Sequence, residues 1–410
     1  MVTAQSRQQY RRRWYFTLSL LILVLLYVGL CLLLPLRTLY SAAGASSLKI
    51  STQTANLPWP SYGESAIGML GSGVIQTHGQ QKPLPIASVA KLITALAVLK
   101  KYPLGLGQQG PIITLDATDY SLYTTYVSEQ GSVVPVYSGE QLSEYQMLEA
   151  MLVPSGNNIA DALARWAYGS VASYDAYANT FVRSLGLDST HVGGDASGFL
   201  PTTTSTANDL ILLGEKVMQN PVLRQIVGMK SVNVPNVGVM NNYDGILGVD
   251  GIVGIKTGNS NQAGGVFLSA SNTTINGHTV TLLTALMGAP NLSGALSDSV
   301  PLVVSLQASF SRAILVSKGE VLGEFKQPWG GNIQIVAQGN LANFLLQGQS
   351  VNALMNIHGL KVPSPSSTTV GSISVPANQF NLRQSIPLVT LQPTTKPSLV
   401  WRLTHPEAEI

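Results

Sequence analysis

Ser88 and Lys91 lie three residues apart near the start of LPIASVAKLITALAVLKK, a stretch that spans residues 84–101. This stretch is apolar on almost every side, which predicts a buried helix. Residues three apart share one helix face, so Lys91 can reach the Ser88 hydroxyl. Burial disfavours the ammonium form and lowers the pKa of a lysine. A neutral lysine beside a serine is a general base beside a nucleophile, and the positive helix N-terminus would favour an oxyanion.

Two further motifs restrict the class of enzyme that the sequence could encode. They comprise Ser155 and Asn157 in VPSGNN, and Lys256, Thr257 and Gly258 in GIVGIKTG. The first lies between predicted helices at 138–152 and 157–169, and the second ends a predicted strand. S-x-x-K and S-x-N match elsewhere in the chain, whereas K-T-G occurs once. These three motifs, in this order on helix, loop and strand, are typical of penicillin-binding proteins and class A β-lactamases.

The remaining pattern predicts the scaffold that holds these residues. We expect a strand pair at 64–79, helices at 173–187 and 206–220, short strands within 232–258, a hairpin at 264–288 turning at Asn276–Gly277, and a closing helix at 297–316. Strands, a helical block, further strands and a final helix predict an α/β (α+β) fold in which an antiparallel sheet packs on helices. A small β-rich C-terminal domain is expected to follow.

The N-terminal segment predicts a membrane anchor. Trp14 to Leu36 contains no charged residue and would span about 35 Å as a helix, and four arginines precede it. This asymmetry predicts a cytoplasmic N-terminus and an extracytoplasmic remainder. A cleavable signal peptide is the alternative, because small residues follow in YSAAGAS. The expected organisation is a cytoplasmic tail (1–13), an anchor (14–36), a linker (37–62), a peptidase domain (63–316) and a β-rich domain (317–410).

Charge and cysteine content exclude several classes of function. The net charge is +3, but the first 63 residues hold six basic and no acidic residues, leaving 17 basic against 20 acidic residues in the remainder. The basic balance therefore belongs to the anchor, and no nucleic-acid-binding pattern remains. Cys31 is the only cysteine and lies in the anchor, so no internal disulfide or cysteine zinc site is expected. The histidines form no H-E-x-x-H pair, and neither metal nor cofactor is predicted.

Longer stretches carry a family resemblance. KPLPIASVAKLITAL, EQLSEYQMLEAMLVPSGNNIADALA, LGLDSTH, ASGFLPTTTSTANDL and DGIVGIKTG resemble the D-alanyl-D-alanine carboxypeptidases, the low-molecular-mass penicillin-binding proteins. The resemblance covers about residues 61–316, and the β-rich tail is similar to the second domain of many members. It implies a membrane-bound serine peptidase that trims peptidoglycan stem peptides ending in D-Ala-D-Ala, with β-lactams as covalent inhibitors.

The resemblance also implies residue roles. Ser88 would attack the carbonyl between the terminal D-alanines and Lys91 would take its proton. Ser155 would relay a proton to the leaving amine, and Asn157 would orient Lys91 and the substrate amide. Lys256 would supply positive charge and Thr257, followed by Gly258, would bind the substrate carboxylate. The N–H groups of Ser88 and Asn259 would form the oxyanion hole. We expect a neutral Lys91, and a charged Lys256 that is more open to water.

Departures from the family pattern keep alternatives open. The stretch ALMGAPNLSGALSDSV lacks the basic residue that some members use to bind the terminal carboxylate, and the end, WRLTHPEAEI, is not expected to form an amphipathic anchor. A serine β-lactamase is one alternative, but Glu215 is the only Glu between Asn157 and Lys256 and lacks the expected neighbours. A D,D-endopeptidase shares the same acyl-enzyme. A non-catalytic cell-wall-binding scaffold would be expected to lack one of the motif residues.

Overall fold

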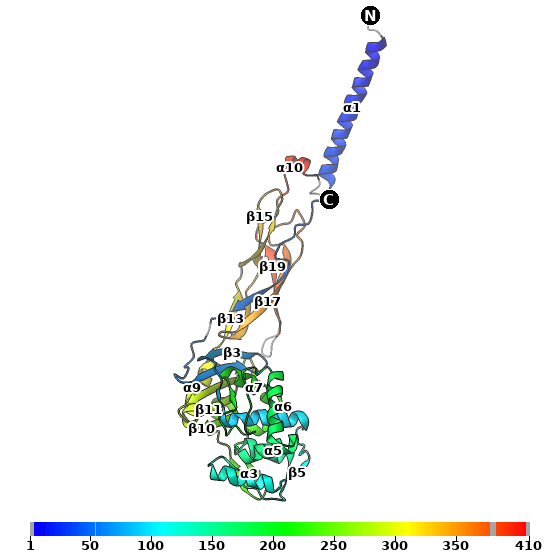
Figure 1. The fold of residues 1–410 in the computed structure, drawn as a ribbon. Helices are drawn as coiled ribbons and strands as arrows, with labels where there is room; N and C mark the ends of the chain where they lie inside the picture. Colours follow the sequence, from blue (N-terminus) through cyan, green and yellow to red (C-terminus); the bar gives the residue numbers. More distant parts are fainter. Residues whose placement is uncertain (1–3, 54, 378–382, 407–410) are drawn as a thin grey trace. The chain divides into compact units, whose positions relative to one another are not determined.

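The computed structural model describes residues 4–53, 55–377 and 383–406 and divides the chain into two compact units (Figure 1). The larger unit comprises Thr52–Ser311 with Leu345–Gln349. The smaller unit comprises Met1–Ser51, Arg312–Phe344 and Ser350–Ile410. Each unit has its own antiparallel sheet, so each is described separately.

The larger unit is built on a five-stranded antiparallel sheet. In spatial order its strands are β10 (Ile252–Ser260), β11 (Gly264–Ile275), β12 (His278–Ala289), β2 (Glu64–Met69) and β3 (Gly73–His78). The predicted hairpin is confirmed as β11–β12. Its turn residues Asn276 and Gly277 both have positive φ, 52° and 78°, as a two-residue hairpin turn requires. The predicted strand pair at 64–79 is confirmed as β2–β3.

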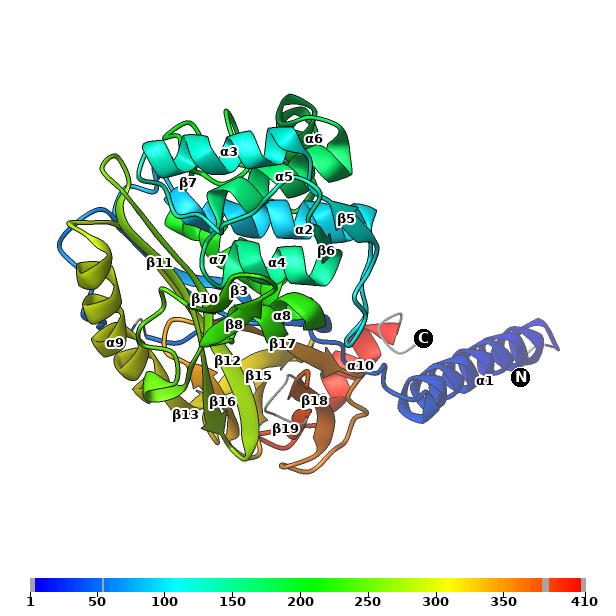
Figure 2. The same cartoon turned by 90° about the horizontal axis from the view of Figure 1, so that it is seen from below.

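Helices cover both faces of this sheet (Figure 2). They are α2 (Lys91–Lys101), α3 (Ala117–Ser128), α4 (Glu144–Leu152), α5 (Asn157–Tyr168), α6 (Val171–Ser184), α7 (Ala207–Gln219), α8 (Pro221–Val227) and α9 (Leu292–Ala308). Alternate residues of β11 point to opposite faces: Val266 and Leu268 join the core with α2 and α7, whereas Phe267 packs with α9. The sheet is therefore buried on both sides.

Short strands complete the larger unit. They pair as β4 (Leu84–Pro85) with β7 (Thr204–Ser205), β5 (Ile112–Thr114) with β6 (Gln141–Ser143), and β8 (Ser231–Val234) with β9 (Gly238–Asn241). The predicted helix at 138–152 is too long, because residues 138–140 lie in a turn and residues 141–143 form β6. Ser143 then caps α4, whose third residue, Gln146, completes a capping box.

Two other helix predictions need comment. The predicted closing helix at 297–316 ends at Ala308 as α9, and the apolar residues after it form β13 (Phe310–Val316) instead. Helix α3 was not predicted, because ATDYSLYTTYVS has no continuous apolar stripe. Its start is fixed by a capping box in which Asp116 accepts from the third residue, Asp119, and Asp119 accepts in return.

The smaller unit holds a six-stranded antiparallel sheet and helix α1 (Ala4–Leu33). In spatial order the strands are β1 (Ala45–Ser51), β17 (Ser350–Ile357), β18 (Thr369–Val375), β19 (Gln384–Thr390), β15 (Asn332–Ala337) and β14 (Val321–Lys326). Strand β13 pairs with β16 (Leu341–Leu346), and a short helix, α10, spans Leu399–Thr404. From Gln8 to Leu33, α1 is long and apolar enough to cross a membrane.

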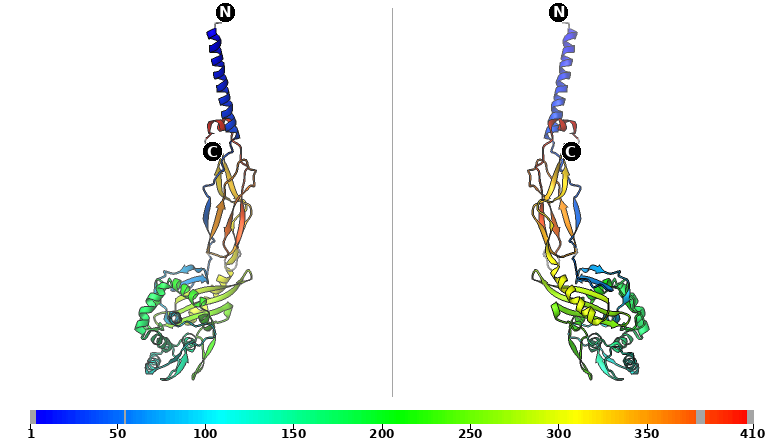
Figure 3. Two further views of the ribbon diagram at one scale, coloured as in Figure 1. Left: turned by 90° about the vertical axis from the view of Figure 1, so that its right-hand side faces the viewer. Right: turned by 90° about the vertical axis from the view of Figure 1, so that its left-hand side faces the viewer.

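Strand β1 lies inside the stretch predicted as a linker, so that prediction is wrong for residues 45–51. The strand pairs with β17 from Ala45 opposite Asn356 to Ser51 opposite Ser350, and Figure 3 shows the two side by side in blue and orange. Six of its seven side chains are exposed. An exposed edge strand needs no alternating apolar pattern, so its sequence resembles a linker although backbone pairing holds it in the sheet.

A pair of truncated proteins tests this role of β1. A chain starting at Thr38 keeps the strand, whereas a chain starting at Thr52 leaves β17 with an unpaired edge. We expect the second protein to lose about tenfold or more of the amide-exchange protection along Ser350–Ile357. Hydrogen exchange with mass spectrometry measures this loss, and the amides of α2 serve as the unaffected control. Equal protection of β17 in the two proteins would show that β1 is dispensable.

Candidate active site

Ser88 and Lys91 meet as the sequence predicts, although the local geometry differs from a continuous helix. Ser88 lies in a short 3₁₀ turn, Ala87–Ala90, and Lys91 is the first residue of α2. The Lys91 Nζ lies 2.8 Å from Ser88 Oγ. Ala87 has a positive φ of 46°, an unfavourable conformation for a residue with a side chain. Ser88, the predicted nucleophile, therefore lies just after a strained residue.

Two glycines let other segments approach this turn closely. A Cβ added to Gly198 would lie 2.1 Å from the carbonyl oxygen of Ala87, and one added to Gly258 would lie 2.7 Å from that of Ile86. Both distances are too short for a real side chain, so any larger residue would force the segments apart. Gly258, a predicted site residue, thus brings β10 against the Ser88 turn.

The Lys91 amine is completely buried and has three oxygen neighbours. Besides Ser88 Oγ, its Nζ contacts Asn157 Oδ1 at 2.7 Å and the carbonyl oxygen of Ser197 at 3.1 Å. A neutral amine has two N–H donors and one lone pair, so the amide and carbonyl oxygens can take the donors and leave the lone pair for the Ser88 hydroxyl. The contacts suit a general base.

Burial and a nearby cation favour the deprotonated form of this amine. Desolvation is the main cause that lowers the pKa of Lys91 well below its usual value, and the positive charge of Lys256 lowers it further. The carboxylates of Asp195 and Asp161 act in the opposite direction. The prediction that Lys91 is deprotonated more easily than a free lysine is thus supported by its surroundings.

Ser155 lies in the tight connection between α4 and α5, and Asn157 is the first residue of α5. Ser155 has a positive φ of 62°, and its Oγ is buried with no hydrogen-bond partner among the described residues. Its hydroxyl is therefore available for a substrate. The backbone N–H of Asn157 donates to the carbonyl of Ser132 at 2.8 Å, and a Cβ on Gly131 would lie 2.7 Å from Asn157 Nδ2. The segment after α3 thus supports Asn157.

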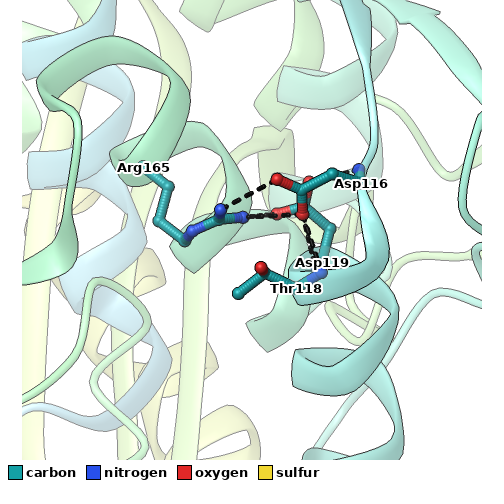
Figure 4. A network of polar contacts seen from close by, with 4 residues as sticks. All are labelled: Asp116, Thr118, Asp119 and Arg165. Atoms are coloured by element: carbon teal, nitrogen blue, oxygen red, sulfur yellow. Dashed lines mark hydrogen bonds and ion pairs between the residues drawn. The ribbon is translucent and has the colours of Figure 1, made fainter.

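An ion-pair network ties α3 to α5 (Figure 4). Arg165 of α5 donates to Asp116 at 3.1 Å and also pairs with Asp119, while Asp116 accepts from the N–H of Thr118. Hydrogen bonding to the Arg165 guanidinium is the main cause that lowers the pKa of Asp116 to about 2. Because α5 begins at Asn157 and α3 leads into the segment that supports it, this network holds two elements of the site together.

Lys256 and Thr257 lie in the middle of β10, opposite Leu268 and Phe267 of β11. Lys256 is only 2% exposed, so the prediction that it is open to water is wrong. Gly258 and Asn259 follow Lys256 closely in the sequence and suggest an exposed strand end. Strand β10 instead continues to Ser260 and is covered by α8 and the Ser88 turn. Burial lowers the pKa of Lys256 to about 7, and the carboxylate of Asp244 opposes that shift.

Asp244 is a buried carboxylate that the sequence analysis missed. Its Oδ1 accepts from the N–H of Ile246 at 3.2 Å, and its Oδ2 finds no hydrogen-bond partner in the described parts of the chain. Burial raises the pKa of Asp244 to about 6, while the Lys256 ammonium lowers it. The residue precedes the K-T-G strand in NNYDG and belongs to none of the three motifs, so no sequence pattern indicated it.

Two further buried carboxylates position the segment that contacts Lys91. Asp195 Oδ1 accepts from the N–H of Ser197 at 2.7 Å and from its hydroxyl at 2.6 Å. Asp161 accepts from the N–H of Ala196 at 2.8 Å and from the Tyr126 hydroxyl at 2.7 Å. These bonds orient the Ser197 carbonyl toward Lys91. The stretch ASGFLPTTT was noticed for its resemblance, but its contact with the lysine was not predicted.

One cleft of about 500 Å³ brings the predicted residues together. Six of the eight line it: Ser88, Ser155, Asn157, Thr257, Gly258 and Asn259. Lys91 and Lys256 are buried and are not part of this lining. The stretch that lacks the expected basic residue contributes Leu292 to the lining. Within the described residues, no His, Cys, Asp and Glu group could hold a metal ion.

Comparison with known proteins identifies the architecture. The family model described as D-alanyl-D-alanine carboxypeptidase matches residues 67–291. The D-alanyl-D-alanine carboxypeptidase DacA of Escherichia coli K12 is 26% identical over 371 residues, which cover 86% of this chain and 88% of the relative. DacB2 of Mycobacterium tuberculosis, another D-alanyl-D-alanine carboxypeptidase, is 30% identical over 214 residues, covering 49% of this chain and 67% of the relative.

Solved structures agree on the fold. Penicillin binding protein 6B from Escherichia coli superposes with a TM-score of 0.57 at 19% identity, covering 83% of this chain and all of that chain. Penicillin binding protein 5 from Haemophilus influenzae gives 0.56 at 19% identity, covering 85% and 98%. The predicted fold class, an antiparallel sheet packed on helices in a mixed α/β architecture, is confirmed. The family match spans the Ser88, Ser155 and Lys256 motifs together, and the chain belongs to the D-alanyl-D-alanine carboxypeptidase family.

Proposed function

We propose that this protein removes the terminal D-alanine from peptidoglycan stem peptides through an acyl-enzyme on Ser88. The observation that carries the proposal is the 2.8 Å contact between Ser88 Oγ and the completely buried amine of Lys91. A lysine that is deprotonated by its surroundings can take the serine proton without help from a histidine. The open cleft beside Ser88 gives a peptide carbonyl access to the nucleophile.

In the acylation step, Ser88 Oγ attacks the carbonyl carbon between the two D-alanines while its proton passes to Lys91 Nζ. The N–H groups of Ser88 and Asn259 stabilise the tetrahedral oxyanion, and single donors of this kind contribute about 3–4 kcal/mol in known enzymes. The C–N bond then breaks, and the leaving amine takes a proton through Ser155. A water molecule next attacks the ester, which releases the shortened peptide and restores the Ser88 hydroxyl.

The substrate carboxylate is assigned to Thr257, with Lys256 behind it. Thr257 lines the cleft, and the Lys256 ammonium would provide positive charge beneath it. Leu292 is the lining residue from the stretch where some relatives carry a basic side chain. Binding of the substrate carboxylate would therefore depend more on residues of β10 than on residues of α9.

The alternative functions fit the site less well. A class A β-lactamase needs a Glu that activates the deacylating water. Glu215 instead accepts from the N–H groups of Gly71 and Gly73, at 2.7 and 3.1 Å, and so fixes the β2–β3 turn. A scaffold would not need the buried Lys91 and its three contacts. A D,D-endopeptidase would use the same residues and differs in the peptide bond that the cleft accepts.

We also propose that α1 anchors the enzyme in the cell membrane, with the N-terminus in the cytoplasm. The support is a helix that is apolar enough to cross a membrane from Gln8 to Leu33. Arg7 precedes this span and three more arginines, at positions 11–13, lie in its first two turns, which favours a cytoplasmic N-terminus. The catalytic unit would then face the extracytoplasmic side, where peptidoglycan lies.

Covalent labelling tests the nucleophile. We expect a penicillin to acylate Ser88, and mass spectrometry of the peptide that contains residues 82–100 to show the adduct. Ser88→Ala should lose all labelling, whereas Ser132→Ala, a change in the same cleft, should retain it. An adduct on Ser155, or no adduct at saturating drug, contradicts the proposal.

The role of Lys91 as the base is tested by replacing it with a side chain that stays protonated. Arginine stays protonated, so Lys91→Arg should slow acylation by about 10²–10⁴-fold. Lys100→Arg, at an exposed position on the same helix, is the control and should be silent. Stopped-flow acylation with a chromogenic β-lactam gives both rates. A rate for Lys91→Arg close to that of the native protein would show that Lys91 is not the base.

The pH dependence tests the electrostatic effect of the Asp244 carboxylate on Lys256. Acylation should rise with pH as Lys91 loses its proton, and fall near pH 7 as Lys256, whose pKa is about 7, loses its own. Removing the Asp244 carboxylate makes the charged form of Lys256 less stable. Asp244→Asn should therefore move the falling limb to lower pH, by about one pH unit.

Two controls separate this effect from a general disturbance of the fold. Lys256→Arg should abolish the falling limb, and adding Asp244→Asn to it should then leave the profile unchanged. Glu144→Gln changes another buried carboxylate that does not line the cleft and should leave the limb in place. A limb that stays at the native pH in Asp244→Asn would mean that this carboxylate does not act on Lys256.

A further inference from the structure

Glu129 is the only charged side chain among the described residues that line the cleft. Its side chain is exposed, and within the part of the chain that the structure describes it makes no ion pair and accepts no hydrogen bond. The buried amines of Lys91 and Lys256 are not part of the lining, so the cleft surface is neutral apart from this carboxylate. Glu129 belongs to none of the three motifs, and sequence analysis did not predict a role for it.

The position of this acid in its helix is unfavourable. Helix α3 ends at Ser128, and Glu129 is its C-cap, whose N–H donates to the carbonyl of Thr125 at 3.0 Å. The C-terminal end of a helix carries a partial negative charge, so it stabilises a cation and destabilises an acid. A residue that breaks such a local rule without a structural partner is expected at a functional site. The carboxylate and the helix end together make this edge of the cleft attractive to a cation.

The backbone of the segment that carries this acid, residues 129–132, is fixed at both ends. The N–H of Gly131 donates to the carbonyl of Tyr126 in the last turn of α3, at 2.8 Å. The carbonyl of Ser132 accepts from the N–H of Asn157, also at 2.8 Å. These bonds hold the acid beside the site, three residues from the group that contacts Asn157.

The acid and the assigned carboxylate site belong to different segments of the lining. A Cβ on Gly131 would lie 2.7 Å from Asn157 Nδ2 and 3.3 Å from Phe199 Cε2, so segment 129–132 packs beside these two lining residues. The terminal carboxylate of the substrate is assigned instead to Thr257, on β10. The part of the substrate that lies on the other side of the scissile bond would extend away from Thr257 and past Asn157, toward the edge that carries the acid.

The size of the cleft and the charge of its edge indicate the chemistry of this part of the substrate. A volume of about 500 Å³ is in the range of sites that bind drug-sized ligands, which is more than two alanine residues need. An exposed carboxylate at a helix C-terminus is suited to a primary ammonium. In a stem peptide, such a group is the side-chain amine of a diamino acid that precedes the two D-alanines. Cross-linking of neighbouring strands through this amine converts it to a neutral amide.

We propose that Glu129, with the C-terminal carbonyl groups of α3, binds the side-chain ammonium of the residue that precedes the two D-alanines. The inference rests on the proposed carboxypeptidase function and deepens it, because it names the substrate class: stem peptides whose side-chain amine is free. An acylated amine carries no charge and loses the ion pair. The enzyme would therefore select unlinked stem peptides over those joined through this amine.

The selectivity is measured as release of D-alanine by the full chain in detergent micelles. The substrates are acetyl-L-lysyl-D-alanyl-D-alanine with a free side-chain amine and the same peptide with that amine acetylated. We expect kcat/KM to be at least about fivefold higher for the free amine, because an exposed ion pair and a helix end each contribute modestly. Equal values of kcat/KM for the two peptides overturn the proposal.

A third peptide separates charge from size. Dimethylation of the same amine keeps its positive charge and adds a bulk comparable to that of the acetyl group. The dimethylated peptide should be cleaved within about twofold of the free one, because the ion pair is retained. A dimethylated peptide that is cleaved as slowly as the acetylated one would show selection by size and overturn the proposal.

Substitutions assign the selectivity to one side chain. Glu129→Gln should reduce the preference for the free amine to within about twofold. Asp188→Asn makes the same chemical change at an exposed acid of the larger unit that does not line the cleft, and it should keep the native preference. Glu129→Lys should reverse the selectivity and favour a peptide whose lysine amine is succinylated and so carries a carboxylate. A native preference that persists in Glu129→Gln overturns the assignment.

Labelling of Ser88 by benzylpenicillin distinguishes failure of this inference from failure of the proposed function. This drug has no amine on its side chain, so its reaction with the native chain tests the nucleophile alone. A chain that is acylated and releases D-alanine, but does not distinguish the peptides, rejects the role of Glu129 and leaves the proposed function intact. A chain that releases D-alanine from none of the peptides rejects both.

Discussion

The burial of one amine, that of Lys91, is the constraint on which the rest of the site depends. A buried amine needs hydrogen-bond partners, and here they come from three separate segments: the Ser88 turn, Asn157 at the start of α5, and the carbonyl of Ser197. The sequence separations are 3, 66 and 106 residues, so the fold must bring distant segments within about 3 Å of one nitrogen. Each supporting interaction in the larger unit, from the Arg165 network to the Asp195 turn, can be understood as holding one of these partners in place.

Close backbone approach is the second requirement, and it explains why strain gathers around the cleft. Ala87 and Ser155 both have positive φ, which costs of the order of 1–3 kcal/mol at a non-glycine residue. Gly198 and Gly258 admit backbone where a Cβ would clash. Such strain persists because the surrounding core is tightly packed, with α2 and α7 buried along the sheet. Stability elsewhere in the larger unit thus maintains an unfavourable backbone geometry at Ala87, next to Ser88, and at Ser155.

The sequence was sufficient to predict the motif residues and the strongly patterned elements, but not the features that depend on distant partners. The β11–β12 hairpin follows from Asn276–Gly277 between alternating strands, and α5 and α7 follow from their apolar period. Strand β1 is exposed and pairs with residues about 300 positions away, so no local pattern could reveal it. The effects of Asp195 on Lys91 and of Asp244 on Lys256 likewise could not be predicted, because only the fold brings these residues near each other. The burial of Lys256 was misjudged for the same reason: the residues that follow it, Thr257 to Ser260, are small and polar, but its spatial neighbours cover it.

The distribution of carboxylates explains how one cleft can contain two lysines in different protonation states. If both were charged, their repulsion would add to the desolvation of each, so the buried pair favours a single proton. Desolvation and the charge of Lys256 act together to lower the pKa of Lys91 well below its usual value, against the opposing carboxylates of Asp195 and Asp161. Lys256 has a pKa of about 7, and the Asp244 carboxylate favours its charged form. In the proposed acylation step, Ser88 would transfer its proton to Lys91, and the leaving amine would then receive a proton through Ser155. The positions of the buried charges would favour both the deprotonated form of Lys91 at the start of this step and the later departure of its proton.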